Sequence, residues 1–149
     1  MRHWLGIALL LLQGACVSAS ASTPAPVLTP APKEIAVGEQ PVTFGYEWRI
    51  EGGEEFPEAA AWLEEEFQLR GWKISDSAAS AVKLQTAEDN GNPEYYTLSI
   101  RDGAVELGAA TKEGMFRAAG RFLALLKQPF TLYDQESFKI GRASCRERV

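Results

Sequence analysis

The amino-acid sequence predicts an α+β fold, in which a mixed β-sheet carries two helices packed on one face. Residues 42–50 alternate between apolar and polar side chains, as in a strand with one buried face. Residues 57–70 and 115–126 place apolar side chains at helical spacing. Residues 94–108 contain two strand patterns joined by the turn signal Asp102-Gly103, which indicates a hairpin. Hairpins combined with two helical crossovers favour a mixed sheet with both helices on the same side.

The remaining elements complete the predicted order β-β-α-β-β-β-β-α-β. Pro57 suits the first turn of the first helix, and Gly71 is expected to end it. The inner stripe of this helix is expected to consist of Phe56, Ala60, Leu63 and Phe67. Further segments are strands at 33–37, 72–74 and 81–86, a turn-rich loop at 89–93, and a last strand at 130–133 after the helix breaker Pro129.

The first 32 residues have the pattern of an export leader and a tether. A charged start, an apolar run at 4–12 and small residues at 15–21 are typical of a signal peptide, which we place at residues 1–21. The apolar run is too short to cross a bilayer, which takes about 20 residues. Residues 12–16 also resemble a bacterial lipobox, in which Cys16 would be lipidated, and we keep lipoprotein and soluble export as equal alternatives. Residues 22–32, rich in Pro, Ala and Thr, are expected to form an extended linker.

The other end of the chain has an unusual composition. Residues 140–149 contain three arginines and the lone Cys145, without an apolar period. The segment resembles the translation of a sequencing adapter, and we interpret residues 139–149 as an artefactual tail. A genuine basic tail is the alternative. The folded domain is therefore expected to span residues 33–138.

Composition restricts the functions open to this domain. Residues 33–139 carry 11 basic and 19 acidic side chains, so their net charge is −8, against −5 for the whole chain. No basic stripe is present, which argues against nucleic-acid binding. Both cysteines and the only histidine, His3, lie outside the domain. This pattern excludes a metal site built on His or Cys within the domain, and we expect no cofactor.

Two groups of residues could in principle form a site. The acidic run Glu64-Glu65-Glu66 cannot converge on one cation from a helix, because successive side chains point about 100° apart. Asp89 and its neighbours lack the spacing of a calcium loop. Five aromatic residues could stack on sugar rings, but core packing is the default interpretation for each: Trp48, Trp62, Trp72, Tyr95 and Tyr96. We assign no catalytic, cofactor-binding or metal-binding residue.

The segment 94–126 resembles the small N-terminal domain of glycoside hydrolase family 20, the β-N-acetylhexosaminidases. That domain typically shows an E-x-Y-x-L strand, a D-G turn, a second strand, an alanine-rich corner and a helix opening with G-[LM]-F. Residues 94–98, 102–103, 109–110 and 114–116 match these features. Residues 134–138 lie where the family has a D-x-P-x-F segment leading into its catalytic barrel, here without the proline.

The resemblance implies a supporting domain of an exported bacterial glycosidase. In the family, an Asp-Glu pair on a (β/α)8 barrel removes terminal N-acetylhexosamine from glycans, with the substrate's acetamido oxygen as nucleophile. Asp134 and Glu136 precede the barrel and are not expected to be this pair. The glycan would thus meet the missing barrel, and any membrane contact would come from a lipid on Cys16. The alternatives are a stand-alone periplasmic or surface carbohydrate-binding module and the leading domain of another glycosidase family.

Overall fold

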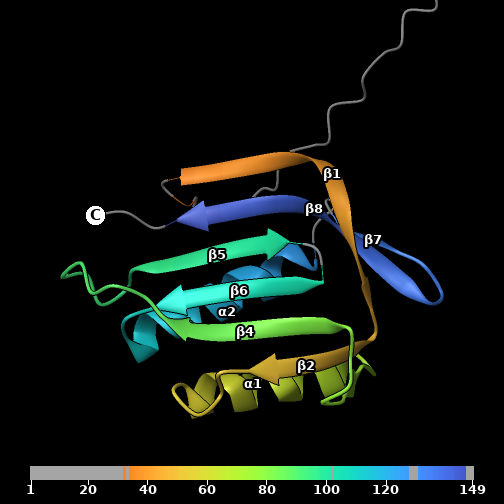
Figure 1. Cartoon of the computed structure of the whole chain (residues 1–149), viewed down its shortest axis with the longest axis horizontal. Coiled ribbons are helices and arrows are strands. Elements are labelled where there is room, and N and C mark those ends of the chain that lie inside the picture. Colours follow the sequence, from red (N-terminus) through yellow and green to blue (C-terminus); the bar gives the residue numbers. More distant parts are fainter. Residues whose placement is uncertain (1–31, 33, 102, 128–130, 147–149) are drawn as a thin grey trace, which may run out of the picture.

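The computed structural model describes residue 32 and residues 34–101, 103–127 and 131–146 (Figure 1). Within these ranges the elements follow one another in the order β1 (Glu34–Gly45), β2 (Glu47–Glu51), α1 (Pro57–Leu69), β3 (Lys73–Ile74), β4 (Ser80–Thr86), β5 (Tyr96–Arg101), β6 (Ala104–Ala109), α2 (Lys112–Leu125), β7 (Thr131–Tyr133) and β8 (Ser137–Arg146). The leader, Cys16 and most of the linker lie outside the described residues, as do Asp102, Pro129 and Phe130. No helix in the described part is long and apolar enough to cross a membrane.

The strands form one mixed sheet in the order β1-β8-β5-β6-β4-β2-β3, with β7 paired to β8. The pairs β1–β8, β8–β5 and β5–β6 are antiparallel, whereas β6–β4, β4–β2 and β2–β3 are parallel. Parallel neighbours need a crossover connection, and α1 supplies it between β2 and β4. The predicted α+β class and the mixed sheet are confirmed.

Both helices cover the same face of the sheet. The ring of Trp48 on β2 lies 5.2 Å from that of Phe67 on α1 and 5.9 Å from that of Phe122 on α2. All three side chains are fully buried, so the core lies between the sheet and this helical layer. The opposite face of the sheet carries partly exposed ion pairs, among them Arg49–Glu51 and Arg101–Glu106. One apolar and one charged face are what period-2 strands produce on a two-layer fold.

Helix α1 buries an apolar stripe that differs by one residue from the predicted one. Leu63 and Phe67 are fully buried and Phe56 is 5% exposed, as predicted. The buried alanine is Ala59 rather than Ala60, because a stripe through 59, 63 and 67 keeps the spacing of four residues. Ala60 is half-buried and faces Gly53, where a Cβ would lie 3.1 Å from its own.

The predicted strand at 42–50 is interrupted at Tyr46. The chain enters β1 at Glu34, continues through a register irregularity between Val37 and Pro41, and leaves it at Gly45. The later half of β1 runs across the end of the sheet, so β2 begins two residues after Gly45 near the opposite edge (Figure 1). The two strands have different partners, β8 for β1 and β4 for β2. An unbroken strand could not lie beside both partners, which explains the break.

Strand β8 extends beyond the predicted domain end at residue 138. It continues to Arg146 and lies between β1 and β5, pairing Ile140 with Val42 and Cys145 with both Ile35 and Leu98. Ile140 is fully buried. The expectation that residues 139–149 lie outside the packed domain therefore does not hold for 139–146. Backbone N–H and C=O groups pair whatever side chains the residues carry. This pairing therefore describes the conformation of residues 139–146 and does not decide between an artefactual and a natural tail. Residues 147–149 lie outside the described part.

Gly114, at the start of α2, lies close to both the loop before β5 and the end of β6. A Cβ on Gly114 would lie 2.4 Å from the carbonyl oxygen of Tyr95 and 3.0 Å from the Cβ of Ala109, the last residue of β6. The N-cap Thr111 holds the start of α2 against this loop, since its hydroxyl donates to the carbonyl of Pro93 and accepts from the N–H of Gly114 at 3.1 Å. Gly120 lies against Trp62 of α1.

Candidate functional site

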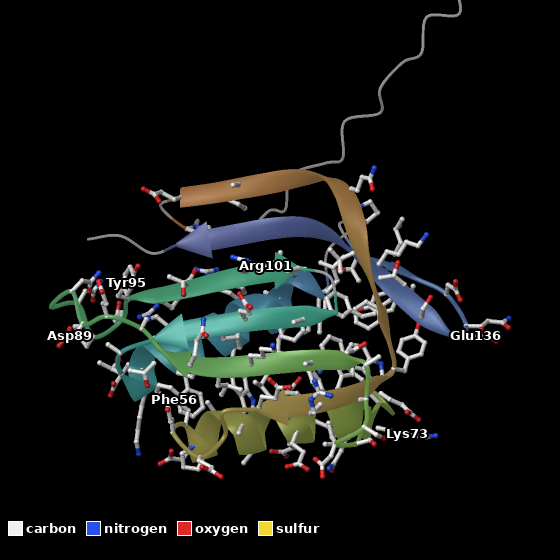
Figure 2. All side chains as sticks on the ribbon, viewed as in Figure 1. Phe56, Lys73, Asp89, Tyr95, Arg101 and Glu136 are labelled. Carbon is white, nitrogen blue, oxygen red and sulfur yellow. The ribbon has the colours of Figure 1, made fainter. Side chains whose placement is uncertain are left out.

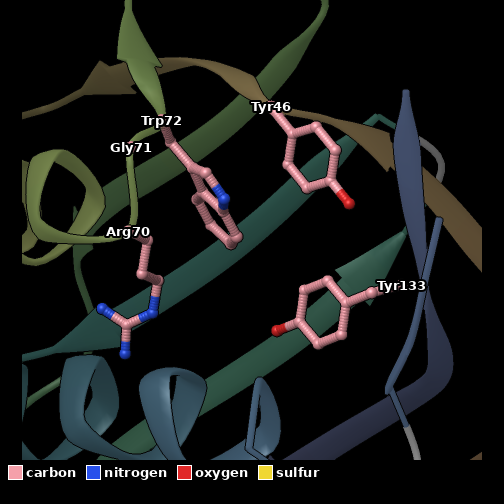
Figure 3. A pocket seen from close by; sticks show the side chains of 5 residues that line it. All are labelled: Tyr46, Arg70, Gly71, Trp72 and Tyr133. Carbon is pink, nitrogen blue, oxygen red and sulfur yellow. The ribbon is translucent and has the colours of Figure 1, made fainter. Parts of the chain in front are cut away.

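A pocket of about 450 Å³ opens where α1 ends, at the end of the sheet that also carries Lys73 and Glu136 (Figures 2 and 3). Three aromatic rings surround it and one arginine closes the side formed by the helix (Figure 3). The lining residues are Tyr46, Arg70, Gly71, Trp72 and Tyr133. Asp89 and Tyr95 lie at the opposite end of the sheet (Figure 2).

The C-terminus of α1 directs Arg70 and Trp72 to the pocket. Gly71 adopts the left-handed conformation with φ of +76°, and its N–H donates to the Gln68 carbonyl at 2.9 Å. The Trp72 N–H donates to the Phe67 carbonyl at 2.9 Å, which completes a Schellman motif. Glycine is favoured here because a side chain resists this conformation. The predicted helix stop at Gly71 is confirmed, and it turns the chain so that Trp72 follows at the pocket wall.

Two tyrosines from other parts of the sheet form the remaining walls. The hydroxyl of Tyr46 lies 2.5 Å from the carbonyl oxygen of Asp134 and 3.0 Å from that of Ser137, so its proton is committed to the β7–β8 connection. The hydroxyl of Tyr133 donates to the Leu126 carbonyl at 2.6 Å. Burial raises the pKa of Tyr133, while the nearby charge of Arg70 acts in the opposite direction. Both phenols therefore have fixed positions, and that of Tyr133 is protonated at neutral pH.

Arg70 is held by the helix from which it projects. Its Nη1 donates to the carbonyl of Glu66 at 2.7 Å and to the carboxylate of Glu66 at 2.6 Å. The side chains of the pair are 20% and 28% exposed, so the guanidinium is ordered and its charge is compensated. No partner for its remaining nitrogens is found among the described residues.

A buried aromatic ring supports the whole pocket. Phe138 on β8 is fully buried, and its ring centroid lies 4.9 Å from that of Trp72, 5.4 Å from that of Tyr133 and 5.7 Å from that of Tyr46. Such ring pairs stabilise one another by about 0.5–1.5 kcal/mol beyond burial. The aromatic walls therefore rest on the core and are preorganised.

A second hollow of about 520 Å³ lies beside the first and shares Tyr46 and Gly71 with it. Its charged lining includes Glu47 and Lys73, whose side chains form an exposed ion pair at 3.4 Å. Exposed pairs of this kind contribute little, about 0–1 kcal/mol. The hydroxyl oxygen of Ser80 accepts a hydrogen bond from the N–H of Gly45 at 3.0 Å and so stabilises the chain where β1 ends and β2 begins.

Of the five aromatic residues considered for sugar stacking, one lines the pocket. Trp48 and Tyr96 are buried in the core, as predicted, with exposures of 0% and 1%. Trp62 stacks on Phe116 between the two helices, with ring centroids 5.7 Å apart. Tyr95 lies far from the pocket (Figure 2). Only Trp72, 8% exposed, reaches it.

Sequence reasoning missed Tyr46, Tyr133 and Arg70. Tyr46 belongs to the predicted alternating strand at 42–50, and Tyr133 to the predicted last strand at 130–133. Their proximity depends on the pairing of β7 with β8, which no local pattern reveals. The sequence signal that could have indicated the pocket is the helix stop at Gly71. A Schellman motif at this glycine fixes the directions of its neighbours Arg70 and Trp72.

The acidic residues do not assemble into a site. Glu66 pairs with Arg70 while Glu64 and Glu65 are exposed, so the run does not converge. Asp89 accepts the N–H of Gly91 at 2.8 Å as part of a loop, as predicted. Asp134 accepts the N–H of Glu136 at 3.0 Å within the β7–β8 turn. In the described part of the chain, no group of three His, Cys, Asp or Glu residues could hold a metal ion.

The sequence pattern of glycosyl hydrolase family 20, domain 2, matches residues 25–141. The chain belongs to this family. The match extends beyond both ends of the resemblance recognised in segment 94–126, so it covers the whole sheet except the end of β8. No curated protein matches the chain.

Several solved structures share the fold of this family 20 domain. A family 20 exo-β-N-acetylglucosaminidase of Vibrio harveyi has a TM-score of 0.62 at 20% identity, over 79% of this chain and 18% of its own. The family 20 β-N-acetylhexosaminidase of Streptomyces coelicolor has a TM-score of 0.58 at 17% identity, over 79% and 25%. The protein CpGH84D has a TM-score of 0.63 at 13% identity, over 81% and 23%.

These likenesses show the fold alone, since all three identities are low. CpGH84D matches as well as the two family 20 enzymes, so the likeness in fold does not by itself assign the family. The family assignment rests on the sequence match. The chain spans between 18% and 25% of the length of these solved proteins.

Proposed function

We propose that this chain is the non-catalytic N-terminal domain of an exported bacterial β-N-acetylhexosaminidase. The parent enzyme would remove terminal N-acetylhexosamine from glycans with an Asp-Glu pair on a catalytic barrel that follows this domain. The observation that carries the proposal is the family 20 domain 2 match over residues 25–141. The acidic residues of the domain support it, because Asp134 and Glu136 lie in an exposed turn and only Glu136 lines a hollow, so the two carboxylates do not converge on one.

Export belongs to the same proposal. The leader pattern at residues 1–21 directs the chain out of the cytoplasm, to the periplasm or the medium, or to the outer membrane if Cys16 is lipidated. Glycan would then be the partner of the barrel. A membrane partner is proposed only through the lipid on Cys16, and nucleic acid is not a proposed partner, given the acidic surplus.

Hydrolysis of an aryl β-N-acetylglucosaminide tests whether catalysis belongs to the downstream barrel and not to this domain. The chain alone should give no turnover above a boiled control. The same chain extended by the downstream genomic sequence, if that encodes a barrel with an adjacent Asp-Glu, should turn the substrate over. Turnover by residues 1–149 alone would contradict the supporting role.

A stand-alone carbohydrate-binding module is the second candidate, and the aromatic pocket is the observation that favours it. The downstream gene sequence separates the two: a barrel supports the enzyme domain, and a stop codon after the domain supports the module. A leading domain of another glycosidase family would be indicated by a downstream barrel with a different catalytic arrangement.

A further inference from the structure

We propose that the pocket formed by Tyr46, Arg70, Trp72 and Tyr133 binds one neutral pyranose ring of a glycan. This site deepens the carbohydrate-binding function proposed above as the second candidate and rests on it. It does not require a barrel, so its failure and the failure of the supporting role can be told apart.

The walls suit the apolar face of a sugar ring. A pyranose presents axial C–H groups on its faces, and these pack on flat aromatic rings. Tyr46, Trp72 and Tyr133 border a space of about 450 Å³, within the size range of small-ligand sites (Figure 3). Trp72 is only 8% exposed and reaches this space with its edge, so the accessible ring face is that of Tyr133. Tyr133 is 50% exposed, so part of its ring is available to a ligand. Burying this exposed ring under a ligand gives a hydrophobic gain.

The polar atoms suit hydroxyl groups. The indole N–H of Trp72 has no hydrogen-bond partner among the described residues, and the free guanidinium nitrogens of Arg70 offer further donors. The hydroxyl proton of Tyr133 is committed to the Leu126 carbonyl, so its oxygen, which points toward the pocket, can only accept (Figure 3). Donors and acceptors therefore surround one apolar space. Sugar hydroxyls both donate and accept, and so complement this mixture.

The charge of the site selects a neutral ligand. Arg70 is already paired with Glu66 at 2.6 Å, so a carboxylate or phosphate would gain little from the guanidinium. An anion would also face the acceptor oxygen of Tyr133. A neutral sugar avoids both penalties.

Titration of the full chain with N-acetylglucosamine and its β-1,4-linked trimer tests the proposal. Calorimetry and tryptophan fluorescence should both show saturable binding, because Trp72 lines the pocket. Glucuronic acid and inorganic phosphate should bind more weakly. The assignment would be overturned if neither neutral sugar bound saturably even well above millimolar concentration. It would also be overturned if an anion bound more tightly than the neutral sugars.

Matched variants place the binding in this pocket. Tyr133→Ala removes one wall and should weaken binding by about tenfold, whereas Leu132→Ala should not change it. Leu132 is 64% exposed on the same strand but does not line the pocket. Arg70→Gln removes the charged donors, and Gln68→Ala, on the exposed side of the same helix turn, is its control.

Folding of each variant is checked by circular dichroism. If Tyr133→Ala does not fold, Arg70→Gln and its control carry the test. Equal loss in a variant and its control would place the sugar elsewhere and overturn the proposal.

Discussion

Two glycines with the same backbone conformation differ in why a side chain is excluded. Gly52 and Gly71 have φ values of +75° and +76°. A Cβ on Gly52 would lie 1.9 Å from the carbonyl oxygen of Leu84 on β4, whereas nothing lies within 4 Å of a Cβ on Gly71. Gly71 is therefore required by conformation alone, and Gly52 by conformation and close packing together.

Substitution by alanine separates these two requirements. Gly71→Ala should lower the free energy of unfolding by about 1–2 kcal/mol, the cost of a left-handed residue with a Cβ. Gly52→Ala must also displace the backbone of β4, and we expect a loss of about 3 kcal/mol or more. Urea denaturation of both variants checks the difference. Equal losses would show that the close approach of Gly52 to Leu84 has no energetic consequence.

Tyr133 should make stability fall at high pH. Burial raises its pKa in the folded chain above the ordinary value. Below the unfolded pKa, about 10, both states are protonated and the shift has no effect. As the pH rises through and above that value, the unfolded chain loses its proton first, so the free energy of unfolding falls.

The variant Tyr133→Phe isolates this contribution, because every other residue is the same in both proteins. At neutral pH it should be less stable by about 1 kcal/mol, since the hydrogen bond to Leu126 is lost. Its stability should decline less than that of the wild type between pH 9 and 11, so the two curves converge. Chemical denaturation across this range is the measurement, and parallel curves would argue against a raised pKa.

At the scale of secondary structure, the periodic segments were predictable and the sheet connections were not. Both helices, the hairpin of β5 and β6, and strand β4 follow from local patterns, because one face of each is buried. The break at Tyr46 and the extent of β8 depend on which strands become neighbours. A sheet order is a non-local property, so residue spacing within 42–50 cannot reveal it.

The pocket was predictable in part for the same reason. Trp72 follows a helix stop and was recognised as a candidate for stacking. Tyr46, Arg70 and Tyr133 come from three separate segments that meet only after the sheet and α1 have formed. The pairing of Tyr133 with Phe138 across β7 and β8 is the contact that brings the last wall into place. No single stretch of sequence contains this information.

Strand β8 provides an element-scale test of where the domain ends. Truncation after Lys139 would remove the buried Ile140, whose burial contributes about 2 kcal/mol, and most of the backbone partners of β1. We therefore expect the midpoint of thermal unfolding to drop by many degrees, or cooperative unfolding to be lost. Truncation after Arg146, which keeps all of β8, is the control. If truncation after Lys139 is harmless, residues 139–149 are an appendage, as the composition of the tail first suggested.

For the whole molecule, the leader pattern at residues 1–21 predicts where the protein resides. If Cys16 is lipidated, the exported protein should partition with membranes, because an acylated cysteine supplies apolar chains that the domain lacks. A Cys16→Ala variant should then appear in the soluble fraction. Fractionation of expressing cells, followed by detection of both forms, makes the comparison. Equal partitioning of the two would favour soluble export through cleavage after Ala19 or Ala21.

The exposed apolar side chains of the domain lead to a prediction about its association. Among the residues that the structure describes, six large apolar side chains are exposed, with the highest values for Leu69 at 75% and Leu132 at 64%; the others are Ile35, Val37, Phe116 and Tyr133. Leu69 adjoins Arg70, and Leu132 adjoins Tyr133, so both lie on segments that contribute to the pocket. Apolar surface of this kind is typical of a contact area for another domain or protein.

The isolated domain should therefore fold but self-associate, and joining it to a downstream barrel should reduce this tendency. Sedimentation velocity over a range of concentrations should show oligomers, and a hydrophobic dye should bind. Replacing both Leu69 and Leu132 with lysine should shift the domain toward monomer, because charge opposes apolar contact at those positions. The same double substitution at the exposed polar residues Gln68 and Gln135 is the control and should leave the association unchanged. A clean monomer at high concentration without dye binding would instead favour the stand-alone module.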